Sequence, residues 1–175
     1  MNELEKVCGA LVNAGAKIKK CCGLHVHLGT SDFKTNIAVW KRLYKNYAAL
    51  ESAIDSFMPP SRRNNSYCRS LKVENWSAKI DGARNLEDLE RRVTGRSRYF
   101  KLNSQSYWRH HTVEFRQHSG SVEFEKVKNW ILFCARFVEF SKKNTVASEE
   151  KSELKKFLSD DLVSFYNNRA ARFAA

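Results

Sequence analysis

The sequence predicts an α+β fold in which helices pack on one face of a small, mostly antiparallel sheet. Segments 23–29, 98–103 and 108–118 alternate apolar and polar residues with a period of two, as strands with one buried face do. Other segments repeat apolar residues every three or four positions, as amphipathic helices do. Because only a short connection separates 98–103 from 108–118, we expect these two strands to form an antiparallel hairpin. Strands and helices mixed in this way favour the α+β class.

The helices are expected before, between and after the strands. The segments with helical spacing are 2–14, 35–57, a short helix capped by Asn85, 123–141 and a last helix that begins at Ser148. Residues 61–84 are polar and show no clear period, so we expect a loop with little regular structure there. We divide the chain into a core of residues 1–145 and a C-terminal helical extension of residues 146–175.

Composition restricts the class of protein. The chain has 175 residues, of which 42% are hydrophobic and 29% charged, which is typical of a globular protein. No apolar run approaches the ~18 residues of a transmembrane helix. The N-terminus also lacks the apolar region of a signal peptide. The five cysteines include the adjacent Cys21 and Cys22 but form no C-x-x-C pair, so we expect reduced thiols in a cytoplasmic protein.

The net charge of +12 needs an explanation. A nucleic-acid surface, a site for polyanions such as nucleotide phosphates, and an acidic partner segment outside this chain are the three options. The arginines gather at positions 62, 63 and 69 and again at 91, 92, 96, 98 and 109. Most of these positions lie in loops or where strands begin. This distribution favours local anion sites over one continuous nucleic-acid track.

Two strands present chemically active side chains on one face. His25 and His27 alternate with Leu24, Val26 and Leu28, and Glu114 and Arg116 alternate in the same way with apolar neighbours. Such a row can hold a metal ion, a phosphate and a proton-transfer group at fixed spacing. We expect both strands to lie in one sheet with their polar faces on the same side. Glycines at both ends of the first strand, at 23 and 29, indicate a close approach to the backbone.

Four blocks of sequence, in this order, resemble the amidoligase family, a phage and microbial branch of the glutamine synthetase and glutamate–cysteine ligase superfamily. The blocks are 22–29, 60–68, 98–103 and 112–120, with Asn129-Trp130 in the next helix. The resemblance implies a curved, partly glutamine synthetase-like sheet. It also implies an ATP-dependent carboxylate–amine ligase that uses Mg²⁺ and forms an amide through an acyl phosphate.

The resemblance also implies roles for individual side chains. His25 and Glu114 would be ligands of a metal ion. Arg116 would contact the transferring phosphoryl group, and His27 would lie near the nucleotide phosphates. The remaining candidates would bind phosphate or substrate or line the pocket: Arg62, Arg63, Tyr99, Asn103 and His118. Which of the two adjacent arginines faces the site is left open.

Members of the family usually begin with a strand that carries Glu-x-Glu. We find no such motif before residue 25, so we expect this chain to correspond to the C-terminal part of an amidoligase. A second chain that supplies an acidic strand is then a possible partner, beside ATP and small carboxylate and amine or peptide substrates. Because only Glu114 and His25 match the metal ligands of the family, we expect this chain alone to be a poor ligase or an inactive one. The alternatives are a basic nucleic-acid-binding module and an inactive remnant of the ligase fold.

Overall fold

Three short antiparallel strands form the sheet in the computed structural model, which describes residues 2–19, 21–34 and 36–174. β3 (Thr112–Phe115) is the central strand, with β1 (Val26–Gly29) on one side and β2 (Leu102–Asn103) on the other. The class predicted from the sequence, α+β with a small antiparallel sheet, is confirmed. The predicted pairing of the segments around 98–103 and 108–118 is confirmed too, although the strands are shorter than the alternating segments.

The strand register separates an apolar face from a polar face. Val26 and Leu102 both lie beside Phe115, and Leu28 lies beside Val113. Because side chains alternate along a strand, these apolar rows share one side of the sheet. Val113, Phe115 and Leu102 are fully buried there.

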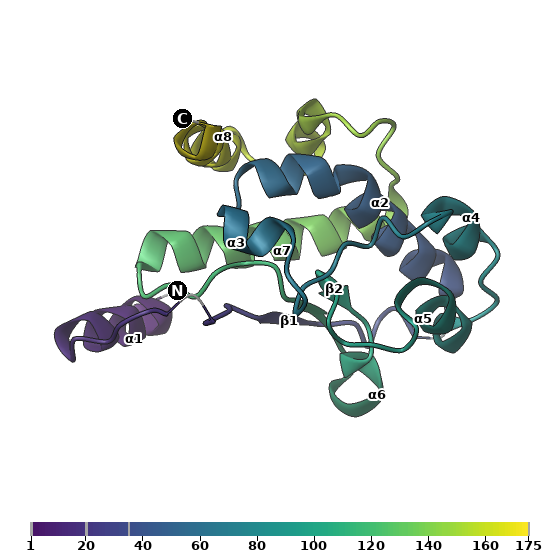
Figure 1. Ribbon diagram of the computed structural model, residues 1–175, viewed down its shortest axis with the longest axis horizontal. Coiled ribbons are helices and arrows are strands. Elements are labelled where there is room, and N and C mark those ends of the chain that lie inside the picture. The colour runs from purple at the N-terminus through teal and green to yellow at the C-terminus, as the bar shows by residue number, and fades with distance from the viewer. Residues whose placement is uncertain (1, 20, 35, 175) are drawn as a thin grey trace.

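Two long helices, α2 (Ile37–Ser56) and α7 (Phe124–Lys143), cover this apolar face (Figure 1). Tyr47 of α2 and Phe137 of α7 both contact the ring of Phe115, at centroid distances of 5.9 and 6.1 Å. α2 begins where the side chain of Asn36 accepts a hydrogen bond from the amide of Ala38, which satisfies a free donor of the first turn. The core therefore lies between the sheet and these two helices.

The C-terminal segment packs on the side of α2 and α7 that faces away from the sheet (Figure 1). It contains a 3₁₀ helix, η1 (Lys151–Lys156), and then α8 (Asp160–Ala174), so the prediction of one helix from Ser148 was wrong about where the α-helix begins. Tyr166 of α8 is buried, and its hydroxyl donates to the carbonyl of Asn129 at 3.0 Å. α1 (Asn2–Asn13) projects at the lower left of Figure 1 and buries only Cys8 among its described residues.

Four short helices connect α2 to β3. They are α3 (Pro60–Arg63), α4 (Trp76–Asp81), α5 (Leu86–Thr94) and α6 (Ser106–His110). The prediction of an irregular loop over 61–84 was therefore wrong in part: α4 buries Ile80, and a helix of one or two turns is too short to show a period. The cap at Asn85 is confirmed, since its side chain accepts from the amide of Asp88 at 2.8 Å.

No helix within these described ranges combines the length and the apolar character needed to cross a membrane.

Candidate active site

A row of polar side chains crosses the open face of the sheet. His27 and Asn103 both lie beside Glu114 in the strand register, one on each neighbouring strand. Asn103 Nδ2 donates to Glu114 Oε2 at 2.7 Å, and His27 Nε2 lies 3.6 Å from Oε1. The prediction that the two motif strands share one sheet and one polar face is thereby confirmed. The register makes Glu114 the centre of this face.

Two further side chains meet the same carboxylate from just beyond the strand ends. His25 Nδ1 lies 2.9 Å from Glu114 Oε1, and Arg116 Nη1 donates to that oxygen at 2.6 Å. Glu114 is only 5% exposed. Burial by itself raises the pKa of Glu114, but hydrogen bonds from His25 and Asn103 and the charge of Arg116 outweigh it and bring the pKa to about 2. Glu114 is therefore ionised at neutral pH.

These side chains line a cleft of about 480 Å³. Its remaining walls come from the segment before β2, from α6 and from the residues next to α6. The lining residues are His25, His27, Arg98, Asn103, Gln105, Ser106, Arg109, His110, Glu114 and Arg116. Three arginines face one carboxylate among them, so the lining carries a net positive charge that suits an anion.

The strand pairing shifts by one residue beyond β3. Val26 pairs with Phe115, but Gly23 pairs with Ser119, so the chain after β3 carries one more residue than the chain before β1 over the same distance. This is the geometry of a β-bulge, which reverses the facing of the residues that follow it. His118 therefore turns away from the polar face and lies 2% exposed with its ring 5.3 Å from that of Trp130.

Burial and the nearby charge of Arg169 lower the pKa of His118 to about 4. Its Nδ1 lies 2.7 Å from the carbonyl oxygen of Ser119. A neutral His118 therefore belongs to the core on the α7 side, outside the lining of the cleft.

Arg62 and Arg63 do not line the cleft either. Arg62 is buried and donates from Nε to the carbonyl of Gln117 at 3.0 Å and from Nη2 to the carbonyl of Arg116. Those are carbonyls of the bulge, so Arg62 fixes the backbone that carries Arg116. Arg63 donates to the carbonyl of Met58 at 2.9 Å, next to α8.

Tyr99 and Gly23 lie close to these groups. The Arg116 guanidinium carbon lies 5.7 Å from the Tyr99 ring centre, and Arg98 Nη2 donates to the Tyr99 hydroxyl at 3.3 Å. That hydrogen bond lowers the pKa of the phenol. At Gly23 a Cβ would lie 3.0 Å from His25 Nε2 and 3.1 Å from Arg62 Nη2, so the predicted close approach is real there. At Gly29 the space is open, and the same prediction was wrong.

The polar face thus brings two histidines, a carboxylate and an arginine of the two strand motifs into one cleft. A family model described as "Putative amidoligase enzyme" matches residues 1–138. The chain belongs to this amidoligase family. This match confirms the resemblance to the amidoligase family that the sequence blocks had indicated. No curated protein and no solved structure matches the chain.

The amidoligase cleft contains residues that the sequence analysis did not assign to the site. Arg98, Gln105, Ser106, Arg109 and His110 all line it. Four of them belong to α6 or precede it directly: Arg109 and His110 lie where the start of a strand was predicted, and Gln105 and Ser106 lie in the predicted connection before it. Arg98 and Arg109 both belong to the second group of arginines, and Arg98 also begins the block 98–103, but neither was assigned a role.

The donors of this amidoligase cleft do not by themselves fit a Mg²⁺ ion. Mg²⁺ prefers six oxygen ligands in octahedral geometry, whereas the cleft offers one carboxylate, three neutral oxygen-bearing side chains (Asn103, Gln105 and Ser106) and imidazole nitrogens. Both oxygens of Glu114 already accept hydrogen bonds. In the part of the chain that the structure describes, no group of three or more His, Cys, Asp or Glu side chains could hold a metal ion. The metal-ligand role of His25 and Glu114 stays a prediction.

Proposed function

We propose that this chain carries the site of an ATP-dependent carboxylate–amine ligase. The observation that carries the proposal is the convergence of His25, His27, Glu114 and Arg116 on one cationic cleft in a member of the amidoligase family. The reaction has two steps. The γ-phosphoryl group of ATP passes to a substrate carboxylate, which gives an acyl phosphate and ADP. The amine nitrogen then attacks the acyl carbon, the carbon–oxygen bond to phosphate breaks, and the nitrogen loses a proton.

The arginines supply charge for the first step. Arg98 and Arg109 are exposed on the cleft wall and can approach the phosphates of a nucleotide. Arg116 is buried and fixed by Glu114, so its guanidinium keeps one position in the cleft. Fixed cations beside a transferring phosphoryl group stabilise the charge on its oxygens in the transition state. The same cations neutralise the two anions that must meet, the carboxylate and the nucleotide.

The histidines suit the second step. The attacking amine must lose a proton, and the imidazoles of His25 and His27 provide nitrogen atoms in the cleft that can take it up. Glu114 lies within 2.9 Å of His25 and 3.6 Å of His27, and as an ionised carboxylate it stabilises an imidazolium beside it. A carboxylate that orients a histidine is a recurring arrangement in proton transfer.

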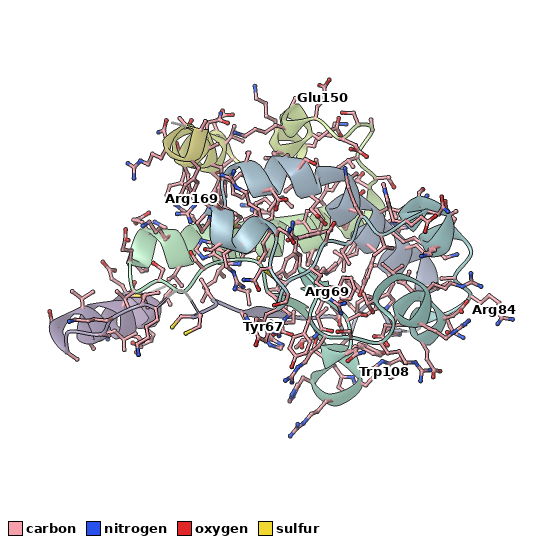
Figure 2. The ribbon with its side chains drawn as sticks, viewed as in Figure 1. Tyr67, Arg69, Arg84, Trp108, Glu150 and Arg169 are labelled. Atoms are coloured by element: carbon pink, nitrogen blue, oxygen red, sulfur yellow. The ribbon has the colours of Figure 1, made fainter. Side chains whose placement is uncertain are left out.

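The test is ADP release by the purified protein with MgATP and a panel of amino acids, peptides and amines. We expect ADP release that needs both a carboxylate and an amine, and at least a tenfold loss in Arg109→Ala and in His25→Gln. Arg84→Ala is the matched control, because Arg84 is an exposed arginine outside the cleft (Figure 2). Equal turnover by all four proteins, or no nucleotide turnover with any substrate pair, would contradict the proposal.

A further inference from the structure

A second hollow of about 440 Å³ adjoins the cleft. It is lined by Glu87 and Glu90 of α5, by Arg96, and by Gln105 and Trp108. Gln105 also lines the cleft, so the two spaces share a wall. Trp108, a residue of α6, lies at the outer edge of the molecule near α5 (Figure 2). We call this hollow the Glu90 pocket.

Glu90 is a buried carboxylate that forms no ion pair with Arg96, the arginine that lines the same pocket. It is 3% exposed, and its oxygens accept hydrogen bonds from the Ser104 hydroxyl at 2.8 Å and from Trp108 Nε1 at 3.1 Å. Among the described residues, no Lys or Arg nitrogen forms an ion pair with it, because Arg96 pairs with Glu87 instead. An ionised carboxylate is costly to bury without a compensating positive charge. Burial raises the pKa of Glu90, and a cation bound from outside would offset the cost of its ionised form.

The exposed ring of Trp108 and the net charge of the pocket also favour a cation as the ligand. Trp108 is 57% exposed, so its ring can meet a ligand, and an indole face attracts cations more strongly than other aromatic rings do. Two acids and one arginine line the pocket, which leaves one net negative charge. In a chain of net charge +12, and next to a cleft lined by three arginines, this is a local reversal of sign.

We propose that the Glu90 pocket binds the ammonium group of an amine substrate, through the carboxylate of Glu90 and the exposed face of the Trp108 ring. This proposal rests on the proposed ligase function, because a carboxylate–amine ligase needs a site for the amine beside the site for the phosphates. The shared wall at Gln105 places the two sites next to each other. The adenine base of ATP is the competing occupant, since a base could also stack on Trp108.

The test uses n-butylammonium as the probe and n-butanol as its uncharged counterpart of similar shape. Binding is followed by NMR, through the side-chain amide of Gln105, which can report in every variant. We expect a saturable shift with n-butylammonium and none with n-butanol. Glu90→Gln should weaken n-butylammonium binding at least tenfold. Glu139→Gln is the control, because Glu139 is an exposed acid on α7.

Trp108→Ala covers the case in which Glu90→Gln does not fold. Trp108 is largely exposed, so its removal leaves the core intact, and we expect about a fivefold loss of n-butylammonium affinity from the missing cation–π contact. Unchanged binding in Glu90→Gln, or in Trp108→Ala if Glu90→Gln is unfolded, would overturn the proposal.

A parallel titration with a non-hydrolysable ATP analogue separates this proposal from the ligase function. We expect Glu90→Gln to bind the analogue as the wild type does. A tenfold loss of analogue affinity in Glu90→Gln would assign the pocket to the base and overturn the proposal. Amine binding that depends on Glu90, in a protein that never releases ADP, would support the amine site and contradict the ligase function.

Discussion

The His25 imidazole and the Glu114 carboxylate meet across two strands that are far apart in the sequence, with His25 Nδ1 2.9 Å from Glu114 Oε1. Arg116 donates to the same oxygen, so one buried carboxylate orients a histidine and an arginine together. A change at Glu114 should therefore affect both folding and the cleft.

Glu114→Gln should destabilise the fold at neutral pH and matter little in acid. The pKa of Glu114 is about 2 in the folded chain against an ordinary 4.5, so the unfolded chain takes up the proton first as the pH falls. The stabilisation is complete above about pH 4.5 and disappears toward pH 2. A shift of this size corresponds to about 3 kcal/mol of unfolding free energy at pH 7.

Urea unfolding of the wild type and of Glu114→Gln, at pH 7 and at intervals down to pH 2.5, measures this difference. Glu139→Gln provides the baseline for loss of an exposed acid. A difference between wild type and Glu114→Gln that stays constant over this range would show that the ion pair does not cause it.

Arg62→Lys should cost about 1–3 kcal/mol of unfolding free energy, because a lysine cannot hold both bulge carbonyls with the forked geometry of a guanidinium. The matched control is Arg63→Lys in the same short helix, where the side chain donates to one carbonyl and is half-buried. Chemical denaturation of both variants gives the comparison. Equal effects of the two substitutions would mean that Arg62 does not support the bulge.

His118 should titrate far below an ordinary histidine. The pKa of the folded side chain is about 4 against 6.5, so the unfolded chain binds a proton between these values and the fold loses stability as the pH falls from 6.5 toward 4. NMR of the ring proton, assigned with His118→Phe, should give a midpoint near 4. A midpoint near 6.5 would place His118 in contact with solvent and contradict its position against Trp130.

Mg²⁺ without nucleotide should not stabilise the protein. A ligand that binds only the folded state raises the melting temperature, and the described donors include one carboxylate already held by Arg116 and Asn103. Thermal unfolding with and without millimolar MgCl₂ measures this, with CaCl₂ as a control for ionic strength and charge. A rise with Mg²⁺ that Glu114→Gln removes would show that Glu114 and His25 form a metal site.

The sequence was sufficient for the parts of the fold that obey a regular period. The alternation around His25 and Glu114 predicted two strands with matched polar faces, and the helical spacing predicted α2 and α7. Both patterns can be read from neighbouring residues alone. The tertiary structure preserves them because the apolar face of the strands packs against the apolar faces of the helices.

The departures from regular structure were not predictable in this way. The extra residue of the bulge has no signature in the alternation, so His118 was expected on the polar face and lies on the other side. Arg62 was expected to bind an anion, but its guanidinium satisfies carbonyls that the bulge leaves unpaired, which only the tertiary structure reveals. The short helix α6, which brings Arg109 to the cleft, interrupts a segment that had resembled a strand.

The measurement that tests the central claim most directly is the affinity of the chain for ATP, in the wild type and in a variant with both Arg98→Ala and Arg109→Ala. Both side chains are exposed on the cleft wall, so their removal spares the core. We expect at least a tenfold weaker affinity in the double variant and none of this loss in Arg84→Ala. ATP binding that is equal in all three proteins, or duplex DNA binding that is strong, salt-sensitive and unchanged in the double variant, would contradict a nucleotide site in this cleft.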